Sequence, residues 1–588
     1  MTDTPAALQF TEAELLGKVA AVDTSRVSVD VSNSILLTRI GIGNLIAIRG
    51  STEREYLIAI TERVTRSMRD ELPEEVPDGE DELMLASVPT DLVRGALIGT
   101  FRTVDGEKKN TFKRGADSFP QIDRECYVVD AGNLQRFMGI LGADFPENEQ
   151  LKLGTFVADR TAEAIVSGDK FFQRHAAILG STGSGKSYAV ALILERAAKL
   201  KYPNILVFDM HGEYAPLADP TKSGFAKRLR IAGPGDLDKP GDDVLFLPYW
   251  LLNRDEMLSM ILDRSDQNAP NQASRFTLHV RNLKEKTLQN EKKDEVAKTF
   301  TVDSPIPYAM DALTALLDKD NTDKAVRADG KGEKAGDWEG KLTRFISRLE
   351  SKLGDRRYGF MFNPPAQANT YEWLAGQTRQ LLGMIEGKGI KIIDFSEVPS
   401  DVLPVVTGTL ARLLYDVQFW MAADKRTPVT LLCDEAHLYL PVRDDADAVQ
   451  RQALGAFERI AKEGRKYGFS LLVVSQRPSD VSKTILSQCN NFLSLRLTND
   501  TDQAVIKRLM PDSLAGLTSI LPLLDTGEAL MLGDAVLLPS RIKLDKPTIA
   551  PDSATRDFWK DWGAQAPDVE AINNAVEALR SQTRSKAA

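Results

Sequence analysis

The chain has 588 residues, of which 74 are Lys or Arg and 84 are Asp or Glu, giving a formal net charge of −10. With 43% hydrophobic and 27% charged residues, the composition is globular and excludes a collagen, a disordered chain and a disulfide scaffold. The length allows about three or four domains. Because the total charge is acidic, a bound nucleic acid would have to meet a local basic lining, such as a groove or a pore.

The cysteines and the apolar runs indicate the cellular compartment in which the protein is expected. Cys126, Cys433 and Cys489 are far apart and form no C-x-x-C pair, so neither a disulfide framework nor a zinc ribbon is expected. No apolar run reaches the ~18 to 20 residues of a membrane span, since even 403–423 contains Arg412 and Asp416. We therefore expect a soluble cytoplasmic protein without a membrane segment.

The first 150 residues have the pattern of short strands. Val27, Val29 and Val31 alternate with polar residues, and further apolar runs follow after turn signals. A small β-barrel fits this pattern, and the acidic stretch from Asp70 to Glu82 is expected to be a hydrated loop without a partner.

A different pattern begins near Phe171. The apolar run at 176–179 leads into a Gly-rich turn, a helical stretch at 187–200 and a second apolar run at 205–208. Strand, loop, helix and strand in this order predict a parallel α/β sheet. Four later apolar runs fit further strands of that sheet: Ile390–Phe395, Val429–Cys433, Phe469–Val474 and Phe492–Leu497.

These patterns divide the chain into five expected segments. Between the early and late strands, the sequence is helical and highly charged, which is typical of an insertion. The expected segments are the barrel at 1–150, the first part of the α/β core at 151–249, the helical insertion at 250–373, the second part of the core at 374–550, and a C-terminal helix and tail at 551–588.

The strongest motif lies between the first apolar run and the helix that follows it. It reads G-x-x-x-x-G-K-[ST], a phosphate loop. Its glycines let backbone N–H groups surround nucleotide phosphates, while Lys186 would reach the β- and γ-phosphates and Ser187 would bind Mg²⁺. No N-K-x-D motif for guanine is present, so we expect ATP rather than GTP. The loop consists of Gly180, Ser181, Thr182, Gly183, Ser184, Gly185, Lys186 and Ser187.

A phosphate loop requires a carboxylate for the metal ion at the end of another strand. The run at 429–433 ends in Asp434 and Glu435. We expect Asp434 to orient the magnesium shell and Glu435 to polarise the attacking water.

Two more residues are candidates for the γ-phosphate. Gln476 follows the run at 469–474 and is a candidate sensor of hydrolysis. Arg465 could reach a neighbouring subunit as an arginine finger, or it could belong to an ordinary helix end closed by Gly468. The sequence does not decide between these alternatives, and Arg459 and Arg477 are further candidates for the finger.

Other polar residues near strand ends indicate a function less specifically. The segment 209–214 sets carboxylates after the strand at 205–208, where they could be functional or structural. The chain has only four histidines, so a histidine-based metal site is not expected. His211 and His437 are therefore interpreted as hydrogen-bonded loop or core residues.

Together these motifs resemble the HerA family of prokaryotic hexameric ATPases, which are related to the FtsK DNA pumps. The resemblance covers most of the chain and is loosest in the insertion. It rests on the early barrel and on seven ordered motifs: Arg174–Gly180 leading into the phosphate loop, Asp209–Tyr214, Ile393–Pro399, Asp434–His437, Glu463–Gly468, Ser475–Pro478 and Leu537–Ile542.

The resemblance implies a RecA-like P-loop core of the HerA/FtsK type preceded by a HAS-type barrel. It further implies a homohexamer that moves double-stranded DNA through a central pore by ATP hydrolysis. Family members commonly work with a NurA-type nuclease, another nuclease or a sirtuin-like effector, in DNA-end processing or antiviral defence. By the same resemblance, Lys186, Glu435, Gln476 and Arg465 would be catalytic, with Ser187 and Asp434 at the metal.

Two other functions are compatible with part of the sequence. The letters of 434–437 also spell the DEAH box of monomeric RNA helicases, but the Q-R-x-G-R-x-G-R motif of their second motor domain is absent. A different alternative is an ATP-gated hexameric scaffold that assembles and activates a partner effector with little dependence on DNA. DNA-stimulated turnover would distinguish the motor from the scaffold.

Overall fold

The computed structural model describes most of the chain. The described residues are 8–71, 86–103, 110–115, 118–143, 145–326, 333–553, 557–564 and 566–582. Nearly all of the predicted acidic loop at 70–82, and the end of the C-terminal tail, lie outside them. The chain forms two compact units: the first is Met1–Arg196, Gln476–Ser479 and Cys489–Pro547, and the second is Ala197–Ser475, Asp480–Gln488 and Thr548–Ala588.

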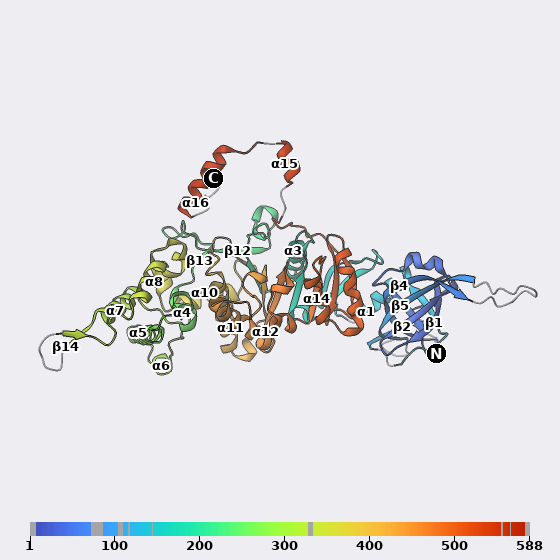
Figure 1. Cartoon of the computed structure of the whole chain (residues 1–588), viewed down its shortest axis with the longest axis horizontal. Helices are drawn as coiled ribbons and strands as arrows, with labels where there is room; N and C mark the ends of the chain where they lie inside the picture. Colours follow the sequence, from blue (N-terminus) through green and yellow to red (C-terminus); the bar gives the residue numbers. More distant parts are fainter. Residues whose placement is uncertain are drawn as a thin grey trace, which may run out of the picture. The chain divides into compact units, whose positions relative to one another are not determined.

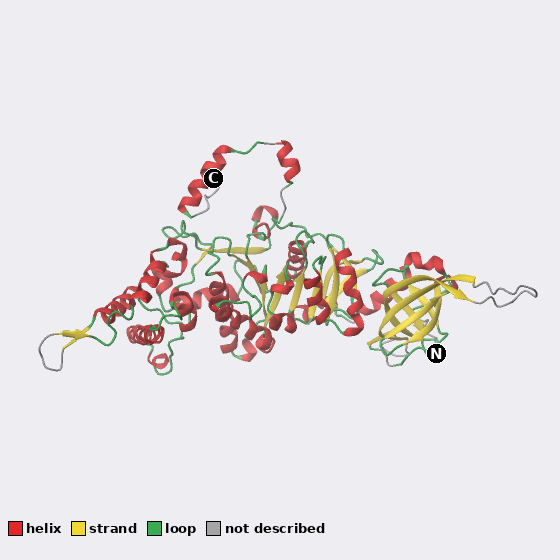
Figure 2. Cartoon of the chain, viewed as in Figure 1, coloured by secondary structure: helices red, strands yellow, loops and turns green. Residues whose placement is uncertain are grey.

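The first unit begins with a closed six-stranded β-barrel (Figures 1 and 2). The strand order is β2-β1-β7-β3-β4-β5, and pairing of β2 with β5 closes the ring. A further strand, β6 (Asn110–Arg114), pairs antiparallel with β5. The barrel predicted from the sequence is therefore confirmed. Its strands are β1 (Leu15–Val22), β2 (Arg26–Val31), β3 (Leu45–Arg49), β4 (Glu55–Glu71), β5 (Ala86–Thr103) and β7 (Glu125–Val129).

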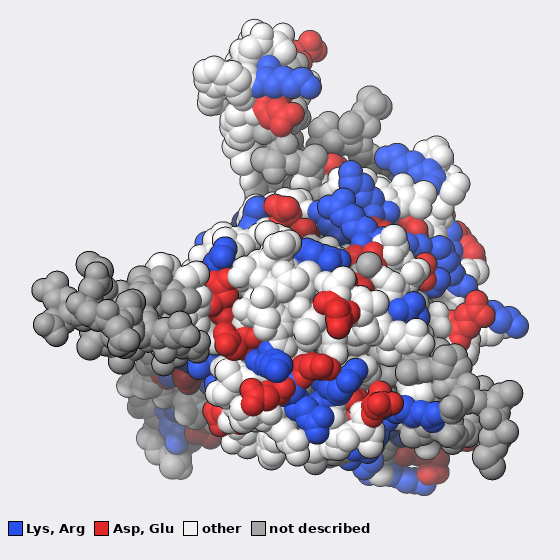
Figure 3. Space-filling view, turned by 90° about the vertical axis from the view of Figure 1, so that its right-hand side faces the viewer, with Lys and Arg blue, Asp and Glu red and all other residues white. Residues whose placement is uncertain are grey.

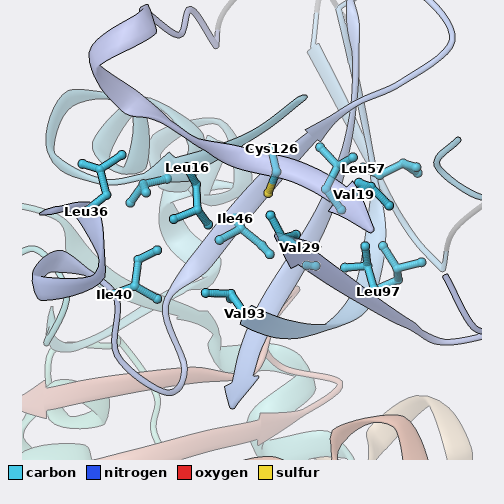
Figure 4. Packing of buried hydrophobic residues seen from close by; sticks show 14 residues of the cluster. Leu16, Val19, Val29, Leu36, Ile40, Ile46, Leu57, Val93, Leu97 and Cys126 are labelled. Atoms are coloured by element: carbon cyan, nitrogen blue, oxygen red, sulfur yellow. The ribbon is translucent and has the colours of Figure 1, made fainter. Parts of the chain in front are cut away.

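Every second side chain along the strands points into the barrel and fills its interior. Val27 and Val29 are fully buried, whereas Asp30 is exposed, as the period of two requires. Ile46 and Cys126, from β3 and β7, lie in the same apolar cluster (Figure 4). The barrel thus has a core of its own.

The remaining strands of the first unit, which belong to a 12-stranded sheet, pair in a mixed parallel and antiparallel order. β10 pairs in parallel with β19, and β19, β20, β21, β8 and β9 then pair antiparallel in that order. The expectation of an entirely parallel sheet was incomplete, because connections as short as that between β20 and β21 allow only antiparallel pairing. The elements are α1 (Ala131–Ala143), β8 (Gln150–Phe156), β9 (Glu163–Ser167), α2 (Gly168–Gln173), β10 (Ala176–Leu179), α3 (Lys186–Ala198), β19 (Asn491–Ser494), α14 (Asp500–Leu509), β20 (Glu528–Gly533) and β21 (Ser540–Leu544).

The second unit contains an all-parallel group of strands. Their order is β13-β12-β16-β11-β17-β18, and all pairs are parallel. Helices α11 and α12 pack closely enough that a Cβ on Gly408 would lie 2.8 Å from Ala453. The elements are β11 (Ile205–Asp209), β12 (Ala226–Ile231), β13 (Val244–Leu245), β16 (Ile390–Asp394), α11 (Leu403–Trp420), β17 (Val429–Cys433), α12 (Ala448–Glu463), β18 (Phe469–Ser475) and α13 (Lys483–Gln488).

The charged region in the middle of the chain is helical, as the sequence predicts. A short antiparallel pair of strands lies within its Gly/Lys/Asp-rich loop. An ion pair connects this region to the core, because Arg412 on α11 donates to Glu256 on α4 at 2.7 Å. The elements are α4 (Arg254–Ile261), α5 (Ala269–Asn290), α6 (Asp294–Ala297), α7 (Met310–Thr322), β14 (Lys324–Val326), β15 (Glu333–Ala335), α8 (Thr343–Gly354), α9 (Gly359–Phe362) and α10 (Trp373–Leu382).

The chain ends in α15 (Phe558–Ala564) and α16 (Val569–Ser581), which expose large apolar side chains such as Trp559 and Leu579. Among the residues that the structure describes, no helix has both the length and the apolar content needed to cross a membrane.

On the face shown in Figure 3, Lys and Arg side chains are interspersed with Asp and Glu. The three cysteines are buried and free, as expected.

Candidate active site

The phosphate loop connects β10 to α3 and depends on its glycines. Gly183 and Gly185 have φ angles of 73° and 104°, in the region that favours glycine. A Cβ on Gly180 would lie 2.6 Å from Ser184 Oγ and 2.9 Å from Leu495 Cβ. The motif therefore adopts the tight turn that its sequence predicts.

Backbone hydrogen bonds fix this loop within the first unit. The Ser181 N–H donates to the Arg496 carbonyl at 2.8 Å, and the Gly527 N–H donates to the Ser184 carbonyl at 2.9 Å. The loop is thereby attached to the segments that follow β19 and precede β20. A rigid loop before a helix N-terminus presents N–H groups to an anion without reorganisation.

Lys186 is the first residue of α3 and is only 9% exposed. Its Nζ donates to the Ser181 carbonyl at 3.4 Å, a long hydrogen bond within the loop itself. The ammonium group therefore lies over the loop, where a phosphate would be bound. Ser187 follows in the first turn of the same helix.

The structure brings Gln476 to the phosphate loop. Thr182 Oγ1 donates to Gln476 Oε1 at 2.6 Å, and both residues belong to the first unit. The two residues are 294 positions apart, so the sequence motifs alone did not predict the contact. Gln476 thus lies beside the loop that would hold the γ-phosphate.

The acidic pair lies at the end of β17 in the second unit. Asp434 is 4% exposed, and burial together with the negative charges of Glu435, Asp209 and Glu213 raises its pKa well above the usual range. Glu435 has φ 44° and ψ 46°, a left-handed conformation that is uncommon for a residue with a side chain. The two carboxylates occupy a buried, strongly negative environment.

The carboxylate of Asp209 holds the turn that follows β11. It accepts N–H groups from Gly212, Glu213 and Tyr214 at 2.8, 3.1 and 3.0 Å. Burial raises its pKa to about 6, although these hydrogen bonds oppose the shift. Of the two roles left open by the sequence, this geometry supports the structural one.

His437 contacts the acidic pair, which the sequence did not indicate. Its Nδ1 lies 3.3 Å from Glu435 Oε2 and 3.4 Å from Ser475 Oγ. The interpretation of His437 as a hydrogen-bonded residue was therefore correct but omitted its partner. His211, by contrast, is exposed.

The candidates for an arginine finger differ in their surroundings. Arg465 lies on the 3-10 turn 464–467 after α12, and its side chain is exposed. Arg459 is engaged within the fold, since it pairs with Asp416 at 3.3 Å and lies over the Tyr415 ring. Arg477 is also exposed.

The acidic side chains of the site bear on how a metal ion would be held. Within the described ranges, no group of three or more His, Cys, Asp or Glu side chains is arranged to hold a metal ion. A magnesium ion of the phosphate-loop type takes few protein ligands and completes its shell with phosphate oxygens and water. The residues present fit that type of site and do not fit a preformed metal centre.

An α/β core with a phosphate loop and an acidic pair after a later strand defines the class of P-loop ATPases. A family model described as "Helicase HerA, central domain" matches residues 151–414. This match, together with the relatives described next, supports a HerA-type ATPase.

Several relatives are similar over most of their length. A probable helicase of Methanocaldococcus jannaschii is 27% identical over 460 residues, covering 76% of each chain. A protein named DNA double-strand break repair helicase HerA is 26% identical in Sulfolobus acidocaldarius, covering 68% of this chain and 71% of the relative. Its namesake in Pyrococcus furiosus is 24% identical, covering 68% and 70%.

Solved structures give weaker similarities. The structure of VirB4 of Thermoanaerobacter pseudethanolicus has a TM-score of 0.44 at 16% identity, covering 68% of this chain and 98% of that chain. The plasmid coupling protein TrwB, in complex with a non-hydrolysable ATP analogue, has a TM-score of 0.43 at 15% identity, covering 70% and 93%.

Proposed function

We propose that this protein binds and hydrolyses ATP with Mg²⁺. In this proposal the phosphate loop and Lys186 bind the phosphates, Ser187 and Asp434 hold the metal ion, and Glu435 activates the attacking water. The proposal is supported above all by the geometry of the phosphate loop. Two of its glycines have positive φ angles, and a buried lysine lies over the turn.

The surroundings of Asp434 and Glu435 support the metal assignment. Several carboxylates lie together in a buried environment, where their mutual repulsion is unfavourable. A divalent cation would relieve that repulsion, and Mg²⁺ prefers oxygen ligands. When bound, the ion would neutralise charge on the phosphate oxygens. The carboxylate of Glu435 would accept a proton from the attacking water.

We propose further that the ATPase is a homohexameric translocase that acts on double-stranded DNA. The match to the HerA central domain supports this, as do relatives named as DNA double-strand break repair helicases. In a ring, Arg465 would act on the nucleotide of the neighbouring subunit, and its exposed position is compatible with that role. Gln476, held beside the phosphate loop by Thr182, would sense the γ-phosphate.

The proposed cellular role is DNA-end processing or antiviral defence together with a partner. By resemblance to the family, the partner would be a nuclease, of the NurA type or another, or a sirtuin-like effector. The partner would supply the chemistry on DNA, while the ring would supply movement.

The test is the steady-state ATPase rate of the purified chain with and without linear double-stranded DNA. The Glu435→Gln variant serves as the blank for contaminating activity. Stimulation by DNA that is absent from the blank is expected for a motor. A genuine rate that DNA does not change would contradict the motor and favour the ATP-gated scaffold.

A further inference from the structure

The acidic pair is followed by a turn that folds back toward Glu435. The 3-10 turn η10 (Ala436–Leu438) begins directly after Glu435, and the Leu438 N–H donates to the Glu435 carbonyl at 2.9 Å. With Glu435 in the left-handed conformation, His437 Nδ1 comes to 3.3 Å from Glu435 Oε2. A backbone conformation that costs free energy is thus associated with a contact between the imidazole and the carboxylate.

The same ring nitrogen has a second neighbour from a distant part of the second unit. Ser475 Oγ, at the last residue of β18, lies 3.4 Å from His437 Nδ1. Ser475 is fully buried, and the side chains of His437 and Glu435 are only 12% and 13% exposed. The residue after Ser475 is Gln476, the proposed sensor. One imidazole therefore lies between the proposed water-activating carboxylate and the strand end that precedes the sensor.

The surroundings distinguish His437 from an ordinary buried histidine. Its Nδ1 meets a carboxylate and a hydroxyl, and the carboxylate belongs to a group of negative charges that includes Asp434, Asp209 and Glu213. A donor beside a carboxylate restricts the orientation of that carboxylate. An N–H at Nδ1 can hold Glu435 Oε2, with Ser475 Oγ limiting the rotation of the ring.

We infer that His437 is a positioning residue that orients the Glu435 carboxylate and links it, through Ser475, to the end of β18. This inference rests on the proposed ATPase function and deepens it. His437 does not touch the reacting atoms, so its loss should lower kcat through misorientation of Glu435. Nucleotide affinity, which depends on the phosphate loop, should be unchanged.

A set of His437 variants tests this arrangement. His437→Asn retains an amide at the position of Nδ1, whereas His437→Gln moves the amide one atom farther out. Because the imidazole that approaches Glu435 Oε2 to 3.3 Å is removed, His437→Ala and His437→Gln should lower kcat by roughly 10-fold or more. Both should leave the KM for ATP within about twofold, and His437→Asn should recover a large part of the rate. Leu438→Ala, on the exposed side of the same turn, is the matched control and should retain wild-type kcat.

A double variant shows whether His437 acts through Glu435. Adding His437→Ala to Glu435→Gln should slow single-turnover phosphate release no further, because the group to be oriented is already neutral. A wild-type kcat for His437→Ala would overturn the inference while leaving the ATPase proposal intact. So would equal loss in the Ala, Gln and Asn variants accompanied by a lowered melting temperature, which would indicate a purely structural histidine. Absence of turnover in the wild-type chain itself would overturn the ATPase proposal and the inference with it.

Discussion

Two buried lysines, Lys186 in the phosphate loop and Lys284 on α5 of the helical region, are satisfied in different ways. Lys284 is 1% exposed, and its Nζ donates to the carbonyls of Val302 and Ser304, both at 2.7 Å. Lys186 is 9% exposed, and its hydrogen bond to the Ser181 carbonyl is long, at 3.4 Å. Two short hydrogen bonds thus hold the ammonium group of Lys284, whereas the hydrogen bond from Lys186 to the Ser181 carbonyl is long.

The difference shows that burial of a lysine does not by itself identify a ligand site. Short hydrogen bonds to two carbonyls fix Lys284 between α5 and the loop after α6, so its role is to hold that loop in place. A long hydrogen bond to the loop that would surround the phosphates lets Lys186 exchange its partner for a stronger acceptor. Substitution should therefore affect activity at Lys186 and stability at Lys284.

The largest expected effect is that of Lys186→Ala. Turnover of ATP should fall to the level of the blank, because the positive donor to the β- and γ-phosphates is lost. The melting temperature should change little, since the hydrogen bond to the Ser181 carbonyl is long, at 3.4 Å. Steady-state phosphate release and thermal unfolding measure the two effects. Normal turnover in this variant would show that the phosphate loop is not the nucleotide site.

A third basic side chain, Arg465, is exposed and would act only across a subunit boundary. Arg465→Ala should lower turnover by on the order of 100-fold, because charge on the transferred phosphoryl group is no longer stabilised. Mixing this variant with Glu435→Gln should recover some activity, since mixed rings contain sites with both intact groups. The recovered activity is measured as phosphate release at different ratios of the two variants. If mixing gave no recovery, the exposed Arg477 would be tested in the same way.

The smallest expected effect is on stability and involves Lys284. Burial lowers its pKa to about 7, from an ordinary value of 10.5. Between these values the unfolded chain binds more protons than the folded chain, so the stability contributed at this position rises with pH. The free energy of unfolding of the wild type relative to Lys284→Met should therefore increase from pH 7.5 to 9.5, by at most about 1.4 kcal/mol per pH unit. Denaturant unfolding of both proteins at both pH values measures this difference in the free energy of unfolding. The same dependence on pH in the wild type and in Lys284→Met would contradict the lowered pKa of Lys284.

The parts of the site that are contiguous in sequence could be predicted. The phosphate loop is one turn whose glycines and lysine define their own geometry, and the acidic pair directly follows an apolar strand. The partners of these groups could not be predicted, because they come from distant positions. Ser475 is 38 residues from His437, and Gln476 is 294 residues from Thr182. Only packing of the strands brings such residues together.

The same distinction applies to the fold. The barrel and the apolar strands were predicted from alternation and from apolar runs. The strand β12 was missed because Lys227, Arg228 and Arg230 give it a charged sequence. In the structure Arg228 pairs with Asp394 and Arg230 pairs with Asp236, so the strand joins the sheet with its charges neutralised. Compensation by residues elsewhere in the chain cannot be read from a local pattern.

The most direct test of the account is a paired measurement of ATP binding and ATP hydrolysis by the Glu435→Gln variant. Because the loop with Lys186 would bind the phosphates and Glu435 would only activate the water, the variant should bind ATP with wild-type affinity. Single-turnover phosphate release should be slower by on the order of 100-fold, because the water loses its anionic base. Wild-type hydrolysis by this variant would contradict the assignment of Glu435. Loss of binding together with hydrolysis would contradict the separation of the two roles.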